Sequence, residues 1–97
     1  MLENLEHTTC YSITSKGILH IKQWEYDGLV FVEGPNNTHL VSLTTIHLLN
    51  FLAAKPNTGQ NEVRSFLTSL LGAPLNEHEF QRLLLTLINI KIIENTA

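Results

Sequence analysis

One stretch of the sequence decides the fold: residues 27–41, which read DGLVFVEGPNNTHLV. Residues 29–32 are an apolar run of strand length, and Asp27-Gly28 before them is a strong signal for a tight turn. The run stops at residues 34–37, where Pro suits the second position of a turn and Asn tolerates a left-handed backbone. Residues 38–41 then follow as another short strand. The stretch therefore predicts two neighbouring strands of an antiparallel meander.

The sequence before this stretch completes the predicted sheet. Residues 18–24 are rich in β-forming side chains and supply its first strand. Residues 1–16 mix acidic, hydroxyl and histidine side chains with few apolar ones and show no sustained period. We expect residues 1–16 to be an N-terminal tail or a loosely docked arm, and residues 17–97 to form the folded domain.

The sequence after residue 41 is typical of three helices. Ser42 can cap a helix over residues 43–54, and Thr58 can cap a second helix over residues 59–71. Asn76, with Glu79 three residues later, has the spacing of a capping box and starts a third helix over residues 77–90, before a short extended end at residues 92–94. The fold class predicted is α+β, a three-stranded antiparallel sheet followed by three helices, in the manner of a winged helix-turn-helix domain.

Length and composition narrow the classes of function. With 97 residues, six basic and nine acidic side chains and a net charge of −3, the chain has the size of one domain with a packed core. No apolar run approaches the ~20 residues that a membrane span needs. The acidic N-terminus lacks the layout of a signal peptide. We therefore expect a cytoplasmic protein that does not enter a membrane.

The sequence contains no motif for catalysis or for metal binding. The single Cys10 excludes an internal disulfide and a cysteine-based zinc site. None of the five histidines has another ligand at the spacing of one helical turn, and the five glycines are scattered turn residues that form no phosphate loop. We expect a protein that is not an enzyme and that holds no metal and no cofactor.

The charge pattern disfavours DNA as the partner. Residues 43–97 carry four basic and four acidic side chains, whereas a DNA-binding domain presents clustered Lys and Arg to the phosphates. The third predicted helix begins Asn76-Glu77-His78-Glu79, which places carboxylates where phosphates would lie. A winged-helix regulator that binds DNA remains an alternative function.

The last predicted strand favours a peptide as the partner. Residues 38–41 end the meander and lie at an edge of the sheet, without the lysines that commonly protect such edges. An extended peptide can add there as a fourth strand. Coverage of the edge by the N-terminal arm, or by a second subunit in a homodimer, is the alternative.

The third predicted helix carries more apolar surface than one core needs. Phe80, Leu84 and Leu87 point in one direction, while Ile88 and Ile90 lie on either side of that stripe. Two interpretations stay open. The helix is packed on two sides by its own domain, or part of the surplus lines a groove for a partner.

Residues 24–31 (WEYDGLVF) and 37–42 (NTHLVS), with the closing segment 84–94, resemble the PqqD-like peptide chaperones, and most closely their branch found with HPr-kinase-related proteins. The resemblance covers residues 17–94. It implies a domain that binds the leader segment of a ribosomally made precursor peptide and presents it to a separate modifying enzyme, such as an HPr-kinase-related protein.

The resemblance also implies the positions of the site. The leader adds as a strand beside the third strand and packs against the third helix, which carries over to the strand residues Asn37, Thr38, His39, Leu40 and Val41 and the helix residues Phe80, Leu84, Leu87, Ile88 and Lys91. The sequence leaves open which face of the strand meets the cleft.

Two residues depart from the family's pattern. Asn36 and Lys91 stand where the family usually has Gly. Asn tolerates a left-handed backbone, whereas Lys just after a helix end costs about 1 kcal/mol relative to Gly. Lys91 can also place a cation near the negative end of the helix.

Overall fold

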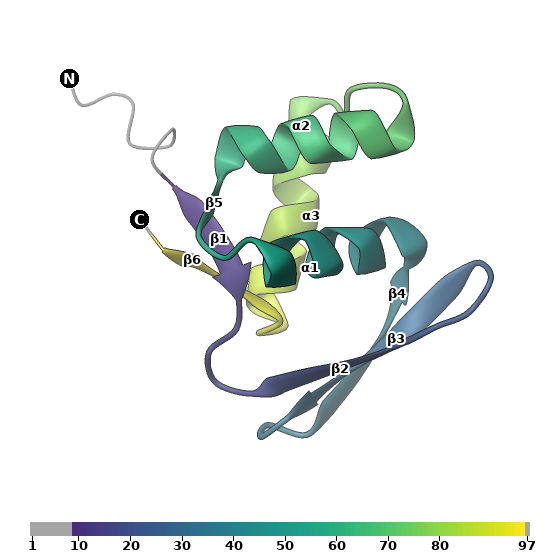
Figure 1. The fold of residues 1–97 in the computed structure, drawn as a ribbon, viewed down its shortest axis with the longest axis vertical. Coiled ribbons are helices and arrows are strands. Elements are labelled where there is room, and N and C mark those ends of the chain that lie inside the picture. Colours follow the sequence, from purple (N-terminus) through teal and green to yellow (C-terminus); the bar gives the residue numbers. More distant parts are fainter. Residues whose placement is uncertain (1–8, 97) are drawn as a thin grey trace.

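The computed structural model describes residues 9–96, which form six strands and three helices (Figure 1). The helices are α1 (Leu43–Ala54), α2 (Gln60–Leu71) and α3 (Glu77–Asn89), and the strands are β1 (Cys10–Ile13), β2 (Ile18–Gln23), β3 (Asp27–Glu33), β4 (Asn37–Ser42), β5 (Thr58–Gly59) and β6 (Ile93–Thr96). The strands form two three-stranded antiparallel sheets, in the orders β2-β3-β4 and β5-β1-β6. The α+β class predicted from the sequence is confirmed.

The predicted meander is the β2-β3-β4 sheet. Gly28 in β3 is required there, because a Cβ atom would lie 2.2 Å from Cδ1 of Ile46 and 2.5 Å from the carbonyl oxygen of Lys22. In the turn between β3 and β4, Asn36 has a φ of 61°, as its tolerance of a left-handed backbone predicts. The strands and the turn at residues 34–37 are therefore confirmed. The turn predicted at Asp27-Gly28 is wrong, because both residues belong to β3 and the tight turn before it lies at residues 25–26, closed by the hydrogen bond from the N–H of Trp24 to the carbonyl of Asp27.

The second sheet corrects the prediction for the N-terminal segment. Residues 10–13 are not part of a tail, because they form β1, the central strand between β5 and β6, and Tyr11 is buried. Desolvation by burial raises the pKa of Tyr11 above its ordinary value. The partners of β1 come from residues 58–59 and 93–96, so nothing near it in the sequence indicates the pairing. The remainder of the predicted arm, residues 1–8, lies outside the described residues.

The helices follow their predicted capping signals closely. Helix α1 has the predicted bounds, and its N-cap Ser42 accepts a hydrogen bond from the N–H of Thr45. Helix α3 begins after Asn76, whose side chain accepts a hydrogen bond of 2.8 Å from the N–H of Glu79. Local chemistry at the helix ends is sufficient to place these two helices.

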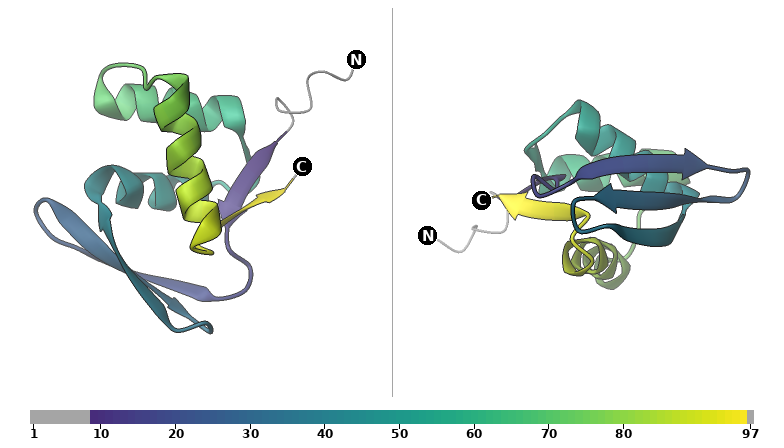
Figure 2. Two further views of the ribbon diagram at one scale, coloured as in Figure 1. Left: turned by 180° about the vertical axis from the view of Figure 1, so that it is seen from behind. Right: turned by 90° about the horizontal axis from the view of Figure 1, so that it is seen from below.

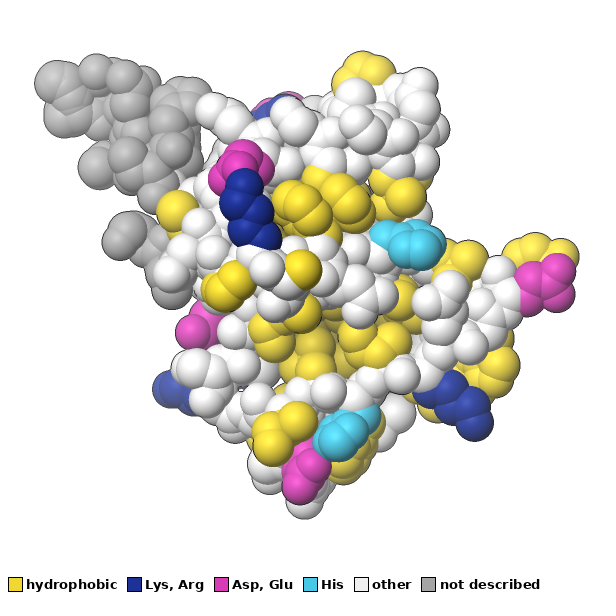
Figure 3. All heavy atoms as spheres, viewed as in Figure 1, with side chains coloured by type: hydrophobic (Ala, Val, Ile, Leu, Met, Phe, Trp, Pro, Cys, Tyr) yellow, Lys and Arg dark blue, Asp and Glu magenta, His cyan; other side chains and the backbone are white. Residues whose placement is uncertain are grey.

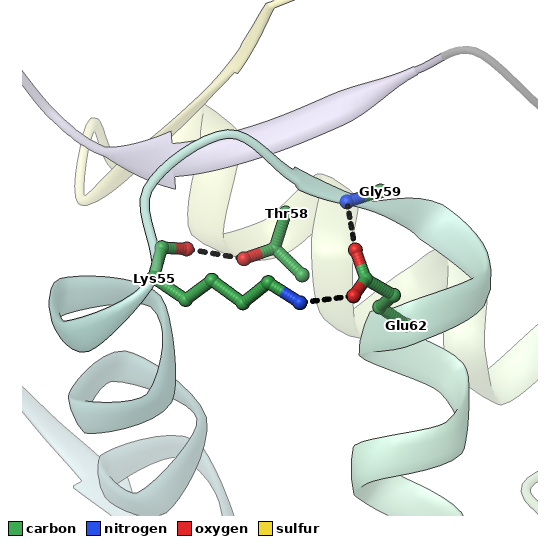
Figure 4. Close-up of polar contacts among 4 residues, drawn as sticks. All are labelled: Lys55, Thr58, Gly59 and Glu62. Atoms are coloured by element: carbon green, nitrogen blue, oxygen red, sulfur yellow. Dashed lines mark hydrogen bonds and ion pairs between the residues drawn. The ribbon is translucent and has the colours of Figure 1, made fainter.

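The start of α2 differs from the prediction by one residue. Gly59 is the N-cap, and Thr58 lies fully buried in β5 with its hydroxyl donating to the carbonyl oxygen of Lys55 (Figure 4). The Glu62 carboxylate accepts hydrogen bonds from Lys55 and from the Gly59 N–H, and both hold the pKa of Glu62 below its ordinary value. Thr58 was the wrong cap because its backbone is needed for pairing with Tyr11.

The end of α3 has the bonding pattern of a Schellman motif. The N–H of Ile92 donates to the carbonyl of Leu87 at 3.1 Å, and the N–H of Lys91 donates to the carbonyl of Ile88 at 3.0 Å. Lys91 holds the left-handed position of this motif, with a φ of 67°. The chain then turns directly into β6, so the extended end predicted for residues 92–94 becomes an edge strand of the second sheet.

The core lies between the meander, the second sheet and the three helices. Val30 and Val32 of β3 point into it, as do the apolar side chains of α1 and α3. Helix α1 packs against the inner face of the meander, the face that Val30 and Val32 share (Figure 1). None of the helices within residues 9–96 has the length and apolar character to cross a membrane.

Candidate functional site

The candidate site is the free edge of β4. Among the described residues, the order β2-β3-β4 leaves β4 without a strand on its outer side. This confirms the predicted position at an edge of the sheet. The described part of the predicted N-terminal arm does not cover this edge, because β1 pairs with β5 and β6 instead.

The hydrogen-bond register shows which backbone groups of β4 face outward. The N–H of Trp24 donates to the carbonyl of Asp27 at 2.8 Å, which continues the register between β2 and β3. In antiparallel sheets, the residues of a strand bond alternately to one neighbour and to the other. The odd-numbered residues of β3 therefore bond to β2, and the even-numbered ones bond to β4.

The same alternation continues across β4. His39 and Val41 lie opposite Val30 and Gly28, so their backbone groups bond to β3. The backbone N–H and C=O groups of Thr38 and Leu40 consequently point away from the sheet. These two residues can accept a guest strand without giving up any bond within the domain.

The side chains of β4 alternate between the two faces of the meander. His39 and Val41 are half-buried and share the inner face with Val30. Thr38 and Leu40 lie on the outer face, where Leu40 is 67% exposed. The structure therefore places His39 and Val41 on the inner face of the meander and Thr38 and Leu40 on its outer face.

His39 has one unusual feature for a residue at the sheet edge. Its Nε2 atom is buried and has no hydrogen-bond partner within residues 9–96. A buried polar atom without a partner costs about 1–3 kcal/mol. Such a group beside an open edge is a polar position that an added strand can satisfy.

Helix α3 lies beyond the edge of β4. Seen from below, the strands follow one another in the order β2, β3, β4, and α3 comes after β4 (Figure 2). A strand added to β4 therefore extends the meander toward α3.

Most of the predicted wall residues on α3 are not available to a guest. Phe80, Leu84 and Leu87 are only 0–2% exposed and belong to the core. The prediction that they line an open cleft is wrong for Phe80 and Leu87, because the centre of the apolar stripe is already covered by the domain itself. Leu84 is also buried, although it is among the residues that line the second hollow described below.

Ile88 and Lys91 do line a hollow, of about 420 Å³, at the end of α3. Its other lining residues come from the β1–β2 link, the β3–β4 turn and β6: Thr14, Lys16, Pro35, Ile93, Glu94 and Asn95. A second hollow of about 470 Å³ lies between α3 and β1 and touches Leu84, Leu85 and Ile88.

The hollows lie beside the α3 residues of the predicted site but not beside its β4 residues. Neither of them includes a residue of β4 among the described part of the chain. The first hollow reaches the end of the β4 edge through Pro35, which precedes Asn37 by two residues. Sequence reasoning missed Lys16 as a site residue, because the link after β1 was interpreted as part of a tail. It missed Pro35 because that residue was interpreted only as part of a turn.

Among the longer edge strands, β4 is distinguished by its lack of charge. Lys22 lies on β2, the other edge of the meander, and Glu94 lies on β6. None of the six residues of β4 carries a formal charge when its histidine is neutral. Charged side chains protect edge strands from pairing with other chains, so β4 is the edge least protected against pairing.

The β2 edge also has apolar surface beside it. In the view of Figure 3, apolar side chains gather between α1 and the meander, on the side of the molecule opposite α3. This edge turns the backbone groups of Leu19, Ile21 and Gln23 outward, by the same alternation. It is therefore the natural comparison for any test of β4.

The described residues offer little for metal binding. Within residues 9–96, no three His, Cys, Asp or Glu side chains lie close enough together to hold a metal ion.

Comparison with family models, with curated proteins and with solved structures finds no match to this chain.

Proposed function

We propose that this protein binds an extended peptide, which adds as a fourth strand to the free edge of β4. The observation that carries the proposal is the outward direction of the Thr38 and Leu40 backbone groups on an edge strand without formal charge. Backbone hydrogen bonds supply affinity in this mode of binding, and the side chains of alternate residues supply selection.

The faces of β4 indicate which guest residues are selected. Guest side chains on the inner side lie next to Val41 and His39, so apolar residues at alternating positions are favoured there. A hydrogen-bonding group opposite His39 can satisfy its buried Nε2 atom. With few backbone bonds and a small apolar contact, we expect a dissociation constant of roughly micromolar size.

The resemblance to PqqD-like peptide chaperones extends this proposal to a biological role. The segments that carry most of the resemblance, residues 24–31 and 37–42, lie on β3, β4 and the turn before β3. In this role the guest is the leader segment of a precursor peptide, the meander and three helices form a winged-helix-like domain, and a separate enzyme performs the modification. The chain itself performs no catalysis.

A proline scan of the two edges tests the proposal. Leu40→Pro removes an outward N–H from β4, and Gln23→Pro removes an outward N–H from β2, which makes it the matched control. A displayed library of random 12-residue peptides is selected on the unchanged protein. Affinities of the selected peptides are then measured for all three proteins by titration calorimetry, with circular dichroism to verify folding.

We expect Leu40→Pro to abolish peptide binding and Gln23→Pro to leave it within about twofold, because only β4 pairs with the guest. Loss of binding in Gln23→Pro, with binding kept in Leu40→Pro, would show that the peptide pairs with β2 instead. A library that yields no binding peptide would refute peptide recognition. A dimer that dissociates on Leu40→Pro and ignores peptides would show instead that a second copy occupies the edge.

Regulation of transcription is the alternative from another class. The exposed start of α3 presents Glu77 and Glu79, which opposes contact with phosphates. A salt-sensitive gel shift with duplex DNA would favour that alternative over the proposal.

A further inference from the structure

The hollow at the end of the β4 edge has an unusual charge for this protein. The chain has a net charge of −3, yet Lys16 and Lys91 both line this hollow, against the single carboxylate of Glu94. That carboxylate is already engaged, because it accepts hydrogen bonds of 3.1 and 3.2 Å from the N–H and the hydroxyl of Ser15. These hydrogen bonds do not cancel the charge of Glu94, but two lysines against one carboxylate leave the lining of the hollow with a net positive formal charge.

The ammonium groups of the two lysines form no ion pair within residues 9–96. All six basic side chains of the sequence lie in the described residues. Lys55 and Arg64 form ion pairs with Glu62 and Glu77, and Lys22 lies 5.6 Å from the ring centroid of Trp24. The remaining three, Lys16, Arg82 and Lys91, form no ion pair within residues 9–96, and two of these three meet in one hollow.

The backbone of Lys91 gives a second, independent observation. Its φ of 67° is one that Gly adopts freely and that side chains with a Cβ atom adopt at a cost. Strained residues of this kind cluster at ligand-binding sites. A lysine at this position adds a cationic side chain to a residue that lines the hollow, which Gly would not do.

We infer that a peptide bound to β4 carries an Asp or Glu residue whose carboxylate is held between Lys16 and Lys91. This inference rests on the proposed function and narrows its ligand to peptides with an acidic residue near one end. Pro35 connects the hollow to the start of β4, so a guest strand that continues past Asn37 enters it. A paired guest strand advances by one residue for each residue of β4. Asn37 and Pro35 precede Leu40 by three and five positions, so the acidic residue lies about three to five positions from the guest residue opposite Leu40.

The test uses the library-selected peptides, synthesised with amidated C-termini so that only side chains supply carboxylates. The variant Lys16→Gln/Lys91→Gly removes both cations, and Gly at position 91 also relieves the strained backbone, which protects folding. The variant Lys22→Gln/Arg82→Gln removes the same charge from elsewhere on the protein and is the control. Affinities are measured by calorimetry at low and at high salt.

We expect acidic residues to be enriched at one end of the selected peptides. Lys16→Gln/Lys91→Gly then weakens binding about 5- to 10-fold at low salt, while the control stays within about twofold. Replacing the peptide's acidic residue by its amide causes the same loss on the unchanged protein and no further loss on the double variant. High salt reduces the difference.

Two results would overturn the inference. One is selected peptides without acidic enrichment, and the other is a double variant that binds them as tightly as the unchanged protein does. If Leu40→Pro abolishes binding in either case, strand addition stands and only the acidic requirement fails. If no peptide binds the unchanged protein, the proposed function and this inference fail together.

Discussion

Strand β4 and helix α3 supply the two halves of the site predicted from the sequence, and they differ in their accessibility to a partner. The centre of the α3 stripe is closed, with Phe80, Leu84 and Leu87 at most 2% exposed. The edge of β4 is open, with the backbone groups of Thr38 and Leu40 turned outward. The sequence of α3 is rich in apolar residues, whereas β4 contains only Leu40 and Val41.

The difference comes from how each element uses its backbone. A helix satisfies its own N–H and C=O groups, so it can offer a partner only its side chains, and a core that buries these side chains leaves nothing to bind. A strand bonds alternately to both sides, so β4 serves the domain through His39 and Val41 and keeps Thr38 and Leu40 for a guest. One edge strand can therefore contribute to stability and to binding at the same time.

The largest expected effect tests whether the apolar stripe of α3 belongs to the core. Leu87→Asp places an unpaired charge in the core and should destabilise the domain by more than about 4 kcal/mol, so that it unfolds. Leu85→Asp is the control, because 54% of that side chain is exposed, and it should change stability by less than about 1 kcal/mol. Circular dichroism during urea titration measures both. A folded Leu87→Asp variant that merely fails to bind peptide would show that α3 has an open wall after all.

The next effect compares a β4 residue whose N–H bonds to β3 with one whose N–H points outward. Val41→Pro removes an N–H that bonds to β3 and should cost about 2–3 kcal/mol, whereas Leu40→Pro removes an outward N–H and should cost less than about 1 kcal/mol. Urea denaturation midpoints measure the difference. Equal losses in the two variants would mean that the alternation assigned to β4 is wrong.

The smallest effect concerns the end of α3, where it meets the hollow. Lys91→Gly should stabilise the domain by about 1 kcal/mol, because Gly adopts the positive φ without strain. Lys91→Ala removes the same charge and keeps the strained backbone, so it should bring no such gain. If both substitutions stabilise the domain equally, the charge of Lys91 rather than its backbone is the cause.

The local elements of the fold were predictable from particular residues. The turn at residues 34–37 separates β3 from β4, and Ser42 and Asn76 start α1 and α3 at the predicted positions. The turn before β3 lies at residues 25–26 and not at the predicted Asp27-Gly28, because Gly28 is needed inside β3, where a Cβ atom would meet Ile46. The β1 strand was not predictable, because Cys10–Ile13 has no clear alternation and its partners lie at the far end of the chain. Missing β1 also hid Lys16, since the link after an unrecognised strand looks like part of a tail.

By itself, the sequence determined the α+β class, the meander, the three helices and the edge position of β4, because turns, caps and strand alternation depend on neighbouring residues. Only the tertiary structure decided that Phe80 and Leu87 belong to the core, that β1 closes a second sheet, and that Lys16 and Lys91 line one hollow. These outcomes depend on contacts between segments up to 86 residues apart in the chain, and such contacts are selected by the packing of the whole domain.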